Sequence, residues 1–199
     1  MGKLITVIGN CGSGKTALTR RLTEHYGLAP LLEQHAERPF QAKFQSDLSS
    51  HALANQFDYL LLRAEQEHAL RASGDTGIAD GGLDQDYYIF TRLFHRKGFL
   101  TDAEYGLCER LYQALRRALP PPDLIVQLSA PLDVLIRRRI TRTRALDIVT
   151  ADDLSAIEDL LHSWMAVNKA PTILFDTSAD DPDYSRTIQP LLQELDRIL

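Results

Sequence analysis

Cysteine is scarce in this sequence, with only Cys11 and Cys108 among 199 residues. Two isolated thiols form no disulfide framework, and their spacing does not suit a zinc site. Long hydrophobic runs are missing too, since no apolar stretch approaches the roughly 20 residues that span a bilayer. The N-terminus runs from Lys3 into a strand-like segment without the features of a signal peptide. We therefore expect a cytoplasmic protein that does not enter a membrane.

Positive charge is also in short supply. Lysine and arginine number 22 against 27 aspartates and glutamates, so the formal net charge is -5. Such a surface as a whole repels nucleic acid and anionic membranes, which argues against a nucleic-acid partner but permits a local basic pocket. The length and the hydrophobic fraction of 44% are typical of one globular domain over residues 1–199.

Short apolar segments alternate with longer helical ones along the chain. Buried strands are expected at 4–8, 78–80, 124–128 and 172–175, with a weaker strand at 31–32. Helices are expected at 15–25, 53–72, 87–94, 103–119, 152–167 and 185–199, and another is expected to open near Pro131. This alternation predicts an α/β fold of three layers, in which a five-stranded parallel sheet carries helices on both faces.

Residues 9–16 read GNCGSGKT and match the pattern G-x-x-x-x-G-K-[ST] between the first strand and the first helix. We call this segment the phosphate loop, because its glycines let backbone N–H groups converge on phosphate oxygens. Lys15 is expected to reach the β- and γ-phosphates, and the Thr16 hydroxyl to take a magnesium position. The expected cofactors are therefore ATP and Mg²⁺. The expected ATP-binding residues are Gly9, Asn10, Cys11, Gly12, Ser13, Gly14, Lys15 and Thr16.

Several further features follow the phosphate loop in order. Glu33 follows the second strand, and Gln56 and Arg63 are seven residues apart, close to two helical turns, so both can face one pocket. Residues 80–90 read DGGLDQDYYIF, and five arginines gather within residues 137–144. Together these segments resemble the deoxyribonucleoside kinase family over nearly the whole chain. The resemblance implies ATP-dependent phosphorylation of the 5′-hydroxyl of a deoxyribonucleoside.

The resemblance also implies the catalytic residues. Glu33 would be the general base that accepts the proton of the attacking hydroxyl, and Asp80 would lie near Mg²⁺ and that hydroxyl. A lid at about 137–150 would close over the phosphates. Its arginines Arg138, Arg142 and Arg144 fit the family spacing R-x-x-x-R-x-R and would neutralise charge on the transferred group.

On the substrate side, the resemblance implies that Gln56, Arg63, Asp86 and Phe90 read the nucleobase. Pairing of Asp86 with Arg63 would favour deoxyadenosine, deoxyguanosine or deoxycytidine over thymidine. Gln45 and Asp147 match positions that contact the sugar 3′-hydroxyl, although the family has a tyrosine where Gln45 stands and usually a glutamate at the other position.

A second departure is Gly81-Gly82, which replaces an arginine and a serine of the family. Both departures lie on the substrate side, so two alternatives stay open. One is a kinase of the same superfold acting on a nucleotide or another small alcohol. The other is an ATP-binding regulator without catalysis. A homodimer is a further expectation from the resemblance.

Overall fold

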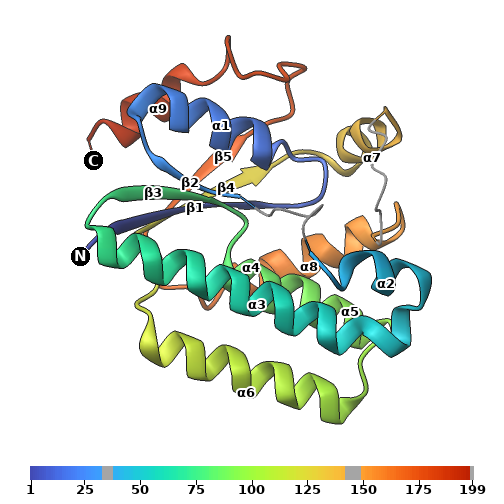
Figure 1. Cartoon of the computed structure of the whole chain (residues 1–199). Coiled ribbons are helices and arrows are strands. Elements are labelled where there is room, and N and C mark those ends of the chain that lie inside the picture. The colour runs from blue at the N-terminus through green and yellow to red at the C-terminus, as the bar shows by residue number, and fades with distance from the viewer. Residues whose placement is uncertain (33–37, 142–148, 198–199) are drawn as a thin grey trace.

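The computed structural model describes residues 1–32, 38–141 and 149–197. A five-stranded, all-parallel sheet in the order β2-β3-β1-β4-β5 forms its centre (Figure 1). The strands are β1 (Lys3–Gly9), β2 (Ala29–Leu31), β3 (Thr76–Asp80), β4 (Leu124–Ser129) and β5 (Thr172–Asp176). The sheet confirms the predicted fold class. Each predicted strand is present within about two residues of its expected position.

The sequence of β1 explains its central place. Every residue of this strand after Lys3 is buried, which is typical of a parallel strand covered on both faces. In the parallel register, Val7 lies opposite Asp80 of β3, and Gly9 lies opposite Leu128 of β4. The carboxyl ends of β1, β3 and β4 therefore lie at the same edge of the sheet, the usual ligand position in open α/β sheets.

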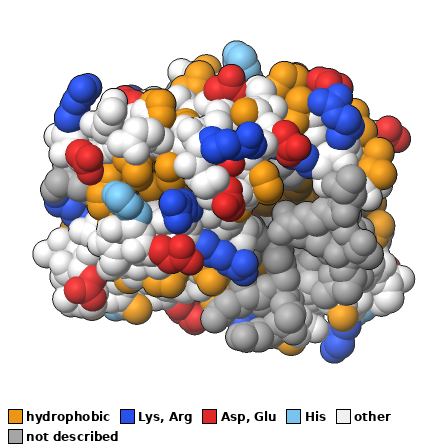
Figure 2. All heavy atoms as spheres, turned by 90° about the horizontal axis from the view of Figure 1, so that it is seen from above, with side chains coloured by type: hydrophobic (Ala, Val, Ile, Leu, Met, Phe, Trp, Pro, Cys, Tyr) orange, Lys and Arg blue, Asp and Glu red, His pale blue; other side chains and the backbone are white. Residues whose placement is uncertain are grey.

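Helices cover both faces of the sheet (Figure 1). On one face lie α1 (Lys15–Tyr26) and α9 (Gln189–Leu195), which pack onto a core containing Leu18, Leu22 and Leu191. Seen from above, the surface on this side carries basic and acidic side chains interspersed (Figure 2).

The other face carries a thicker layer, in which α6 (Asp102–Ala118) forms the outermost helix (Figure 1). The remaining helices of this side are α3 (Leu48–Ser73), α4 (Leu83–Gln85), η2 (Asp86–Thr91), α5 (Arg92–Arg96) and α8 (Asp153–Met165). Two further helices, α2 (Gln41–Ser46) and α7 (Leu132–Thr141), lie toward the carboxyl end of the sheet. Among the described helices, none is long and apolar enough to cross a membrane.

Three helices differ from the predicted boundaries. α3 begins five residues early because the Asp47 side chain accepts a hydrogen bond from the Ser50 N–H and caps it. Where one helix was expected at 87–94, the chain forms the π-helical η2 and then α5. The last helix begins at Gln189 rather than 185, because the Asp181 carboxylate binds the N–H groups of Arg186 and Thr187 in a turn.

Candidate functional site

The phosphate loop joins β1 to α1 at the carboxyl edge of the sheet. Gly12 has φ +85°, and a Cβ there would lie 3.2 Å from the Leu135 carbonyl oxygen of α7, so the position suits glycine alone. Lys15 donates from Nζ to the carbonyl oxygens of Gly9 and Asn10, both at 3.0 Å. The Lys15 ammonium therefore lies against the phosphate loop, within reach of a phosphate bound there.

Two side-chain amides fasten the loop to its surroundings. Asn10 donates to the Leu154 carbonyl at 2.8 Å and to Glu158 Oε2 at 2.9 Å, both on α8, and accepts from the Cys11 N–H. Gln85 accepts from the Gly9 N–H at 3.1 Å. Sequence reasoning assigned Asn10 a phosphate contact and did not assign Gln85. The motif gives no signal for such support, since its variable positions are free to differ.

Thr16 and Asp80, the two residues predicted at magnesium, are in direct contact. The Thr16 hydroxyl donates to Asp80 Oδ2 at 2.6 Å, and Asp80 is only 3% exposed at the end of β3. Hydroxyl and carboxylate oxygens are the ligands that Mg²⁺ prefers, usually with phosphates and waters completing the shell. The residues present therefore fit a magnesium ion shared with a bound phosphate.

The backbone turns sharply just after Asp80. Gly81 has φ +86° and Gly82 has φ +119°, and the Gly81 N–H donates to the Val7 carbonyl at 2.9 Å. Side chains other than glycine rarely adopt such angles. An arginine and a serine would therefore be strained on this backbone, which suits the two glycines present.

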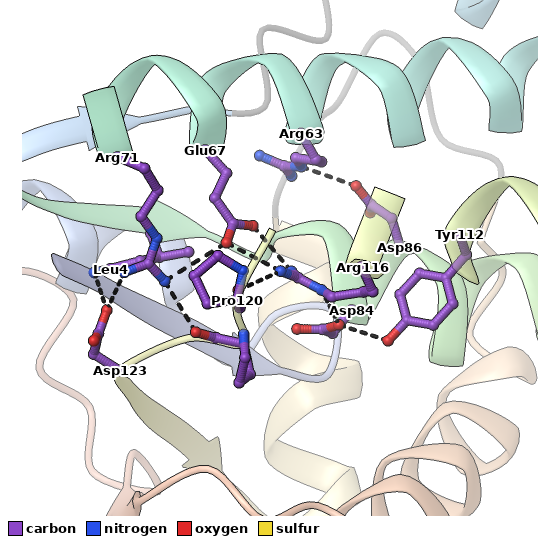
Figure 3. A network of polar contacts seen from close by, with 11 residues as sticks. Leu4, Arg63, Glu67, Arg71, Asp84, Asp86, Tyr112, Arg116, Pro120 and Asp123 are labelled. Carbon is purple, nitrogen blue, oxygen red and sulfur yellow. Dashed lines mark hydrogen bonds and ion pairs between the residues drawn. The ribbon is translucent and has the colours of Figure 1, made fainter. Parts of the chain in front are cut away.

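Arg63 and Asp86 form the pair that the resemblance implies. Arg63 Nε donates to Asp86 Oδ2 at 2.8 Å, between side chains that are 1% and 6% exposed (Figure 3). Gln56, about two turns of α3 before, donates to the Thr91 hydroxyl at 2.8 Å. The Thr91 hydroxyl in turn donates to the Asp86 carbonyl at 3.0 Å, across the π-turn of η2. The structure thus brings Gln56, Arg63 and Asp86 together, with Thr91 as a partner that sequence reasoning missed.

The other predicted substrate residues are less closely joined to this group. Phe90 is half-buried in η2 and packs against the core, with its ring 6.4 Å from that of Phe94. Gln45 is exposed on α2, where Gln41 and Phe44 face inward instead. Asp147 and Glu33 lie outside the described residues.

Only the first part of the predicted lid can be described. Residues up to 141 belong to α7, while Arg142 and Arg144 lie outside the described residues. Arg138 donates from Nη2 to the carbonyl oxygen of Ala179 at 2.6 Å, in the segment that follows β5. Arg137 pairs with Asp133 one turn earlier, at 2.6 Å.

A buried ionic network lies near the Arg63–Asp86 pair (Figure 3). Arg116 of α6 donates to both carboxylate oxygens of Glu67 at 3.0 Å and to Asp84 at 2.8 Å. Tyr112 donates to the same Asp84 oxygen at 2.7 Å, and Arg71 lies 3.7 Å from Glu67. Sequence reasoning did not identify this network. The available signal was weak, namely the spacing of Glu67 and Arg71 one helical turn apart.

Burial and charge act in opposite directions within this network. Burial disfavours the charged Arg116 guanidinium, but Asp84 and Glu67 more than offset it, so the pKa of Arg116 is raised. Burial raises the pKa of the Glu67 carboxyl, although Arg116 lowers it. The network therefore holds α3, α4 and α6 together through buried charges that depend on one another.

Three comparisons connect this geometry to known proteins. The family model described as deoxynucleoside kinase matches residues 5–198. The chain is 26% identical over 150 residues to a deoxyadenosine/deoxycytidine kinase of Bacillus subtilis, covering 74% of this chain and 69% of the relative. It is 25% identical over 144 residues to a deoxyguanosine kinase of the same organism, covering 72% and 68%.

The fold is similar to that of a deoxyadenosine kinase from M. mycoides, solved with dCMP and a flexible dCDP. The TM-score is 0.84 at 18% sequence identity, and the match covers 98% of this chain and 99% of the other. At this identity the likeness establishes the fold, including the arrangement of strands and helices around the phosphate loop.

Proposed function

The chain belongs to the deoxynucleoside kinase family, phosphotransferases with an alcohol acceptor, and we propose that it transfers phosphate from ATP to a nucleoside 5′-hydroxyl. The proposed acceptors are deoxyadenosine, deoxyguanosine and deoxycytidine rather than thymidine. One observation carries the proposal. Gln85 binds the phosphate loop at Gly9, and the next residue, Asp86, pairs with Arg63. The phosphate-binding and base-reading parts are therefore one connected structure.

The phosphate side of the proposal rests on the loop and its neighbours. Backbone N–H groups of residues 12–16 and the Lys15 ammonium would hold the β- and γ-phosphates. Thr16 and Asp80 would hold Mg²⁺, which offsets the negative charge of the phosphates when bound. Lys15 would exchange its two carbonyl partners in the loop for phosphate oxygens, which attract a cation more strongly.

The base preference follows from the chemistry of Asp86. A carboxylate only accepts hydrogen bonds, so it favours bases that present an exocyclic amino group at that edge. Adenine, guanine and cytosine carry an exocyclic amino group, which thymine lacks. The names of the relatives, which act on deoxyadenosine, deoxycytidine and deoxyguanosine, agree with this preference. Phe90 would stack on the base, and Gln56 would bind its edge through the amide.

The chemical step is assigned by the resemblance. Glu33 would accept the proton of the 5′-hydroxyl, while Arg138, Arg142 and Arg144 would neutralise charge on the transferred group. Gln45 and Asp147 would bind the sugar 3′-hydroxyl. Undiminished turnover by a Glu33→Gln variant would exclude the general-base role, because glutamine cannot take up the proton.

The decisive experiment is a coupled assay of ATP consumption with deoxyadenosine, deoxyguanosine, deoxycytidine and thymidine. We expect turnover with one or more of the first three, reduced at least about a hundredfold in Lys15→Ala. Lys3→Ala, which removes an exposed lysine at the start of β1, should keep full activity.

The same assay distinguishes the alternatives. ATP binding without turnover of any nucleoside would contradict the proposal, and deoxynucleoside monophosphates would then be tried as acceptors, because Gly81-Gly82 changes the acceptor side. We also propose a cytoplasmic enzyme, in line with the small number of cysteines in the chain, and a homodimer, which size measurement in solution checks.

A further inference from the structure

Tyr184 has an unusual backbone conformation in the segment between β5 and α9. It is the one non-glycine residue with positive φ in the described part of the chain, at +58°, and it is 4% exposed. Bulky side chains rarely occupy this left-handed region, and such residues persist only where the surroundings hold them in place. Contacts of the Tyr184 side chain and of the surrounding turn hold this conformation.

The Tyr184 side chain lies directly against the phosphate loop. Its hydroxyl donates to the Ser13 carbonyl oxygen at 3.1 Å, in a buried contact between positions 171 residues apart. It also occupies the space beside Gly14, where a Cβ would overlap the tyrosine hydroxyl. Burial raises the pKa of Tyr184 to about 12, so the hydroxyl keeps its proton and remains a donor at neutral pH.

This bond fixes the orientation of one peptide unit in the loop. The carbonyl of Ser13 and the N–H of Gly14 belong to the same planar trans peptide and point in opposite directions. When the carbonyl is held toward Tyr184, the Gly14 N–H is held toward the other side of the loop. The sequence pattern places a phosphate on that side, at the N-terminus of α1.

A turn after the last strand holds the tyrosine in this position. The Asp181 carboxylate accepts from the Arg186 N–H at 2.9 Å and from both the N–H and the hydroxyl of Thr187, at 2.8 and 2.9 Å. The Tyr184 N–H donates to the Asp181 carbonyl at 3.1 Å, inside the same turn. The tyrosine ring packs against Phe175, with centroids 5.9 Å apart. The turn therefore holds the backbone of Tyr184, and Phe175 packs against its ring.

We propose that Tyr184 is a positioning residue for phosphate binding, which orients the Gly14 N–H through its hydrogen bond to the Ser13 carbonyl. The segment after β5 thereby contributes to affinity for the triphosphate through a side chain that touches only protein. This inference rests on the proposed function in one respect, that the phosphate loop binds ATP. It is independent of which nucleoside is the acceptor.

The test compares Tyr184→Phe with Tyr26→Phe. Phenylalanine keeps the ring and removes the hydroxyl alone. Tyr26 is the control, because its hydroxyl also bonds the C-terminal region, to Asp196 Oδ1 at 2.7 Å and the Leu192 carbonyl at 3.2 Å, but lies at the opposite end of α1 from the phosphate loop. Calorimetric titration with Mg-ATP should show Kd raised roughly three- to tenfold in Tyr184→Phe, the range expected for one lost hydrogen bond. Tyr26→Phe should bind ATP as the wild type does.

Further readouts separate positioning from general damage. The KM for the nucleoside should be unchanged in Tyr184→Phe, and its thermal midpoint should fall no further than that of Tyr26→Phe. Thr187→Val removes one of the bonds that hold the turn, without touching Tyr184, and should raise the ATP Kd by a smaller factor. This second variant tests the inference even if Tyr184→Phe folds poorly.

An unchanged ATP Kd in Tyr184→Phe would overturn the inference, as would an equal loss of affinity for ATP and nucleoside. A wild-type chain that fails to bind ATP would overturn the proposed function and this inference with it. ATP binding by wild type and Tyr184→Phe alike would overturn the inference alone.

Discussion

The phosphate side and the nucleoside side of this site differ in the kind of group expected to bind the ligand. On the phosphate side the expected binding groups are mainly backbone N–H groups, and single side chains such as Asn10, Gln85 and Tyr184 bond the loop that carries them. On the nucleoside side the expected binding groups are side chains on two helices, held by the Arg63–Asp86 pair and the ionic network behind it. Perturbing each side should therefore have different consequences.

A backbone site depends less on side-chain identity, because every residue except proline supplies an N–H group, although the backbone angle at Gly12 and the side-chain bonds of Asn10 restrict those two positions. A side-chain site built on buried charges has less tolerance, since removing one partner leaves another charge buried and uncompensated. We expect substitutions in the network to reduce the stability of the fold, and substitutions around the loop to reduce nucleotide affinity first.

The largest effect on stability is expected from Arg116→Met. Methionine fills similar space but leaves the Glu67 and Asp84 carboxylates, which are 3% and 10% exposed, without their shared partner. We expect the free energy of unfolding to fall by about 3 kcal/mol, measured by urea denaturation.

The neighbouring Arg117 provides the control, because it is exposed on the same helix. Arg117→Met should change the free energy of unfolding by no more than about 0.5 kcal/mol. Equal effects of the two variants would mean that the network contributes no more than a surface charge does.

A smaller and more specific effect is expected from Asp86→Asn. Asparagine keeps the shape but removes both the charge that compensates the buried Arg63 and the charged acceptor proposed for the base, so the free energy of unfolding should fall as well. We expect the KM for the preferred nucleoside to rise roughly tenfold, since hydrogen bonds to charged groups contribute about 1.5 kcal/mol or more. The KM for ATP should change little, measured in the same steady-state assay.

Asp75 offers a control at the opposite edge of the sheet, where it is exposed just before β3. Asp75→Asn should leave both KM values unchanged. A rise in the ATP KM of Asp86→Asn as large as that for the nucleoside would contradict the division of the site into two sides.

The difference between the phosphate side and the nucleoside side also explains which features could be predicted from the sequence. The strands and the phosphate loop were predictable because their signals are local, namely short apolar runs and a pattern of glycines before Lys15-Thr16. Asp80 was placed near magnesium through the family resemblance, and topology explains its contact with Thr16, since parallel strands end at the same edge. The Arg63–Asp86 pair was predicted only through the family resemblance.

The residues that hold the site in place, Tyr184 and Arg116, could not be predicted from the sequence, and the reason is physical. Tyr184 contacts a residue 171 positions away, and Arg116 contacts Glu67 49 positions away. Nothing in the local spacing of either residue distinguishes it from an ordinary helix or turn residue. The left-handed backbone at Tyr184 and the π-turn at 86–91 depend on tertiary contacts, which override local preference.

The smallest effect concerns Asp181, which supports the phosphate side from a distance. Burial alone would raise its pKa, but the Thr187 hydroxyl and the N–H groups of Arg186 and Thr187 lower it to about 2. The ordinary aspartate pKa is about 3.9, so the folded state gains stability from the charged carboxylate above about pH 4. That contribution is lost as the pH falls from about 4 through 2.

The urea midpoint measured against pH tests this assignment. In Asp181→Asn the decline of the midpoint between about pH 4 and 2 should be shallower than in the wild type, because one proton-linked contribution is gone. Asp180→Asn, which changes an exposed neighbour, should decline as the wild type does. Parallel curves for all three proteins would mean that the Asp181 carboxylate does not hold the turn. Tyr184 would then owe its position to packing against Phe175 and the loop alone.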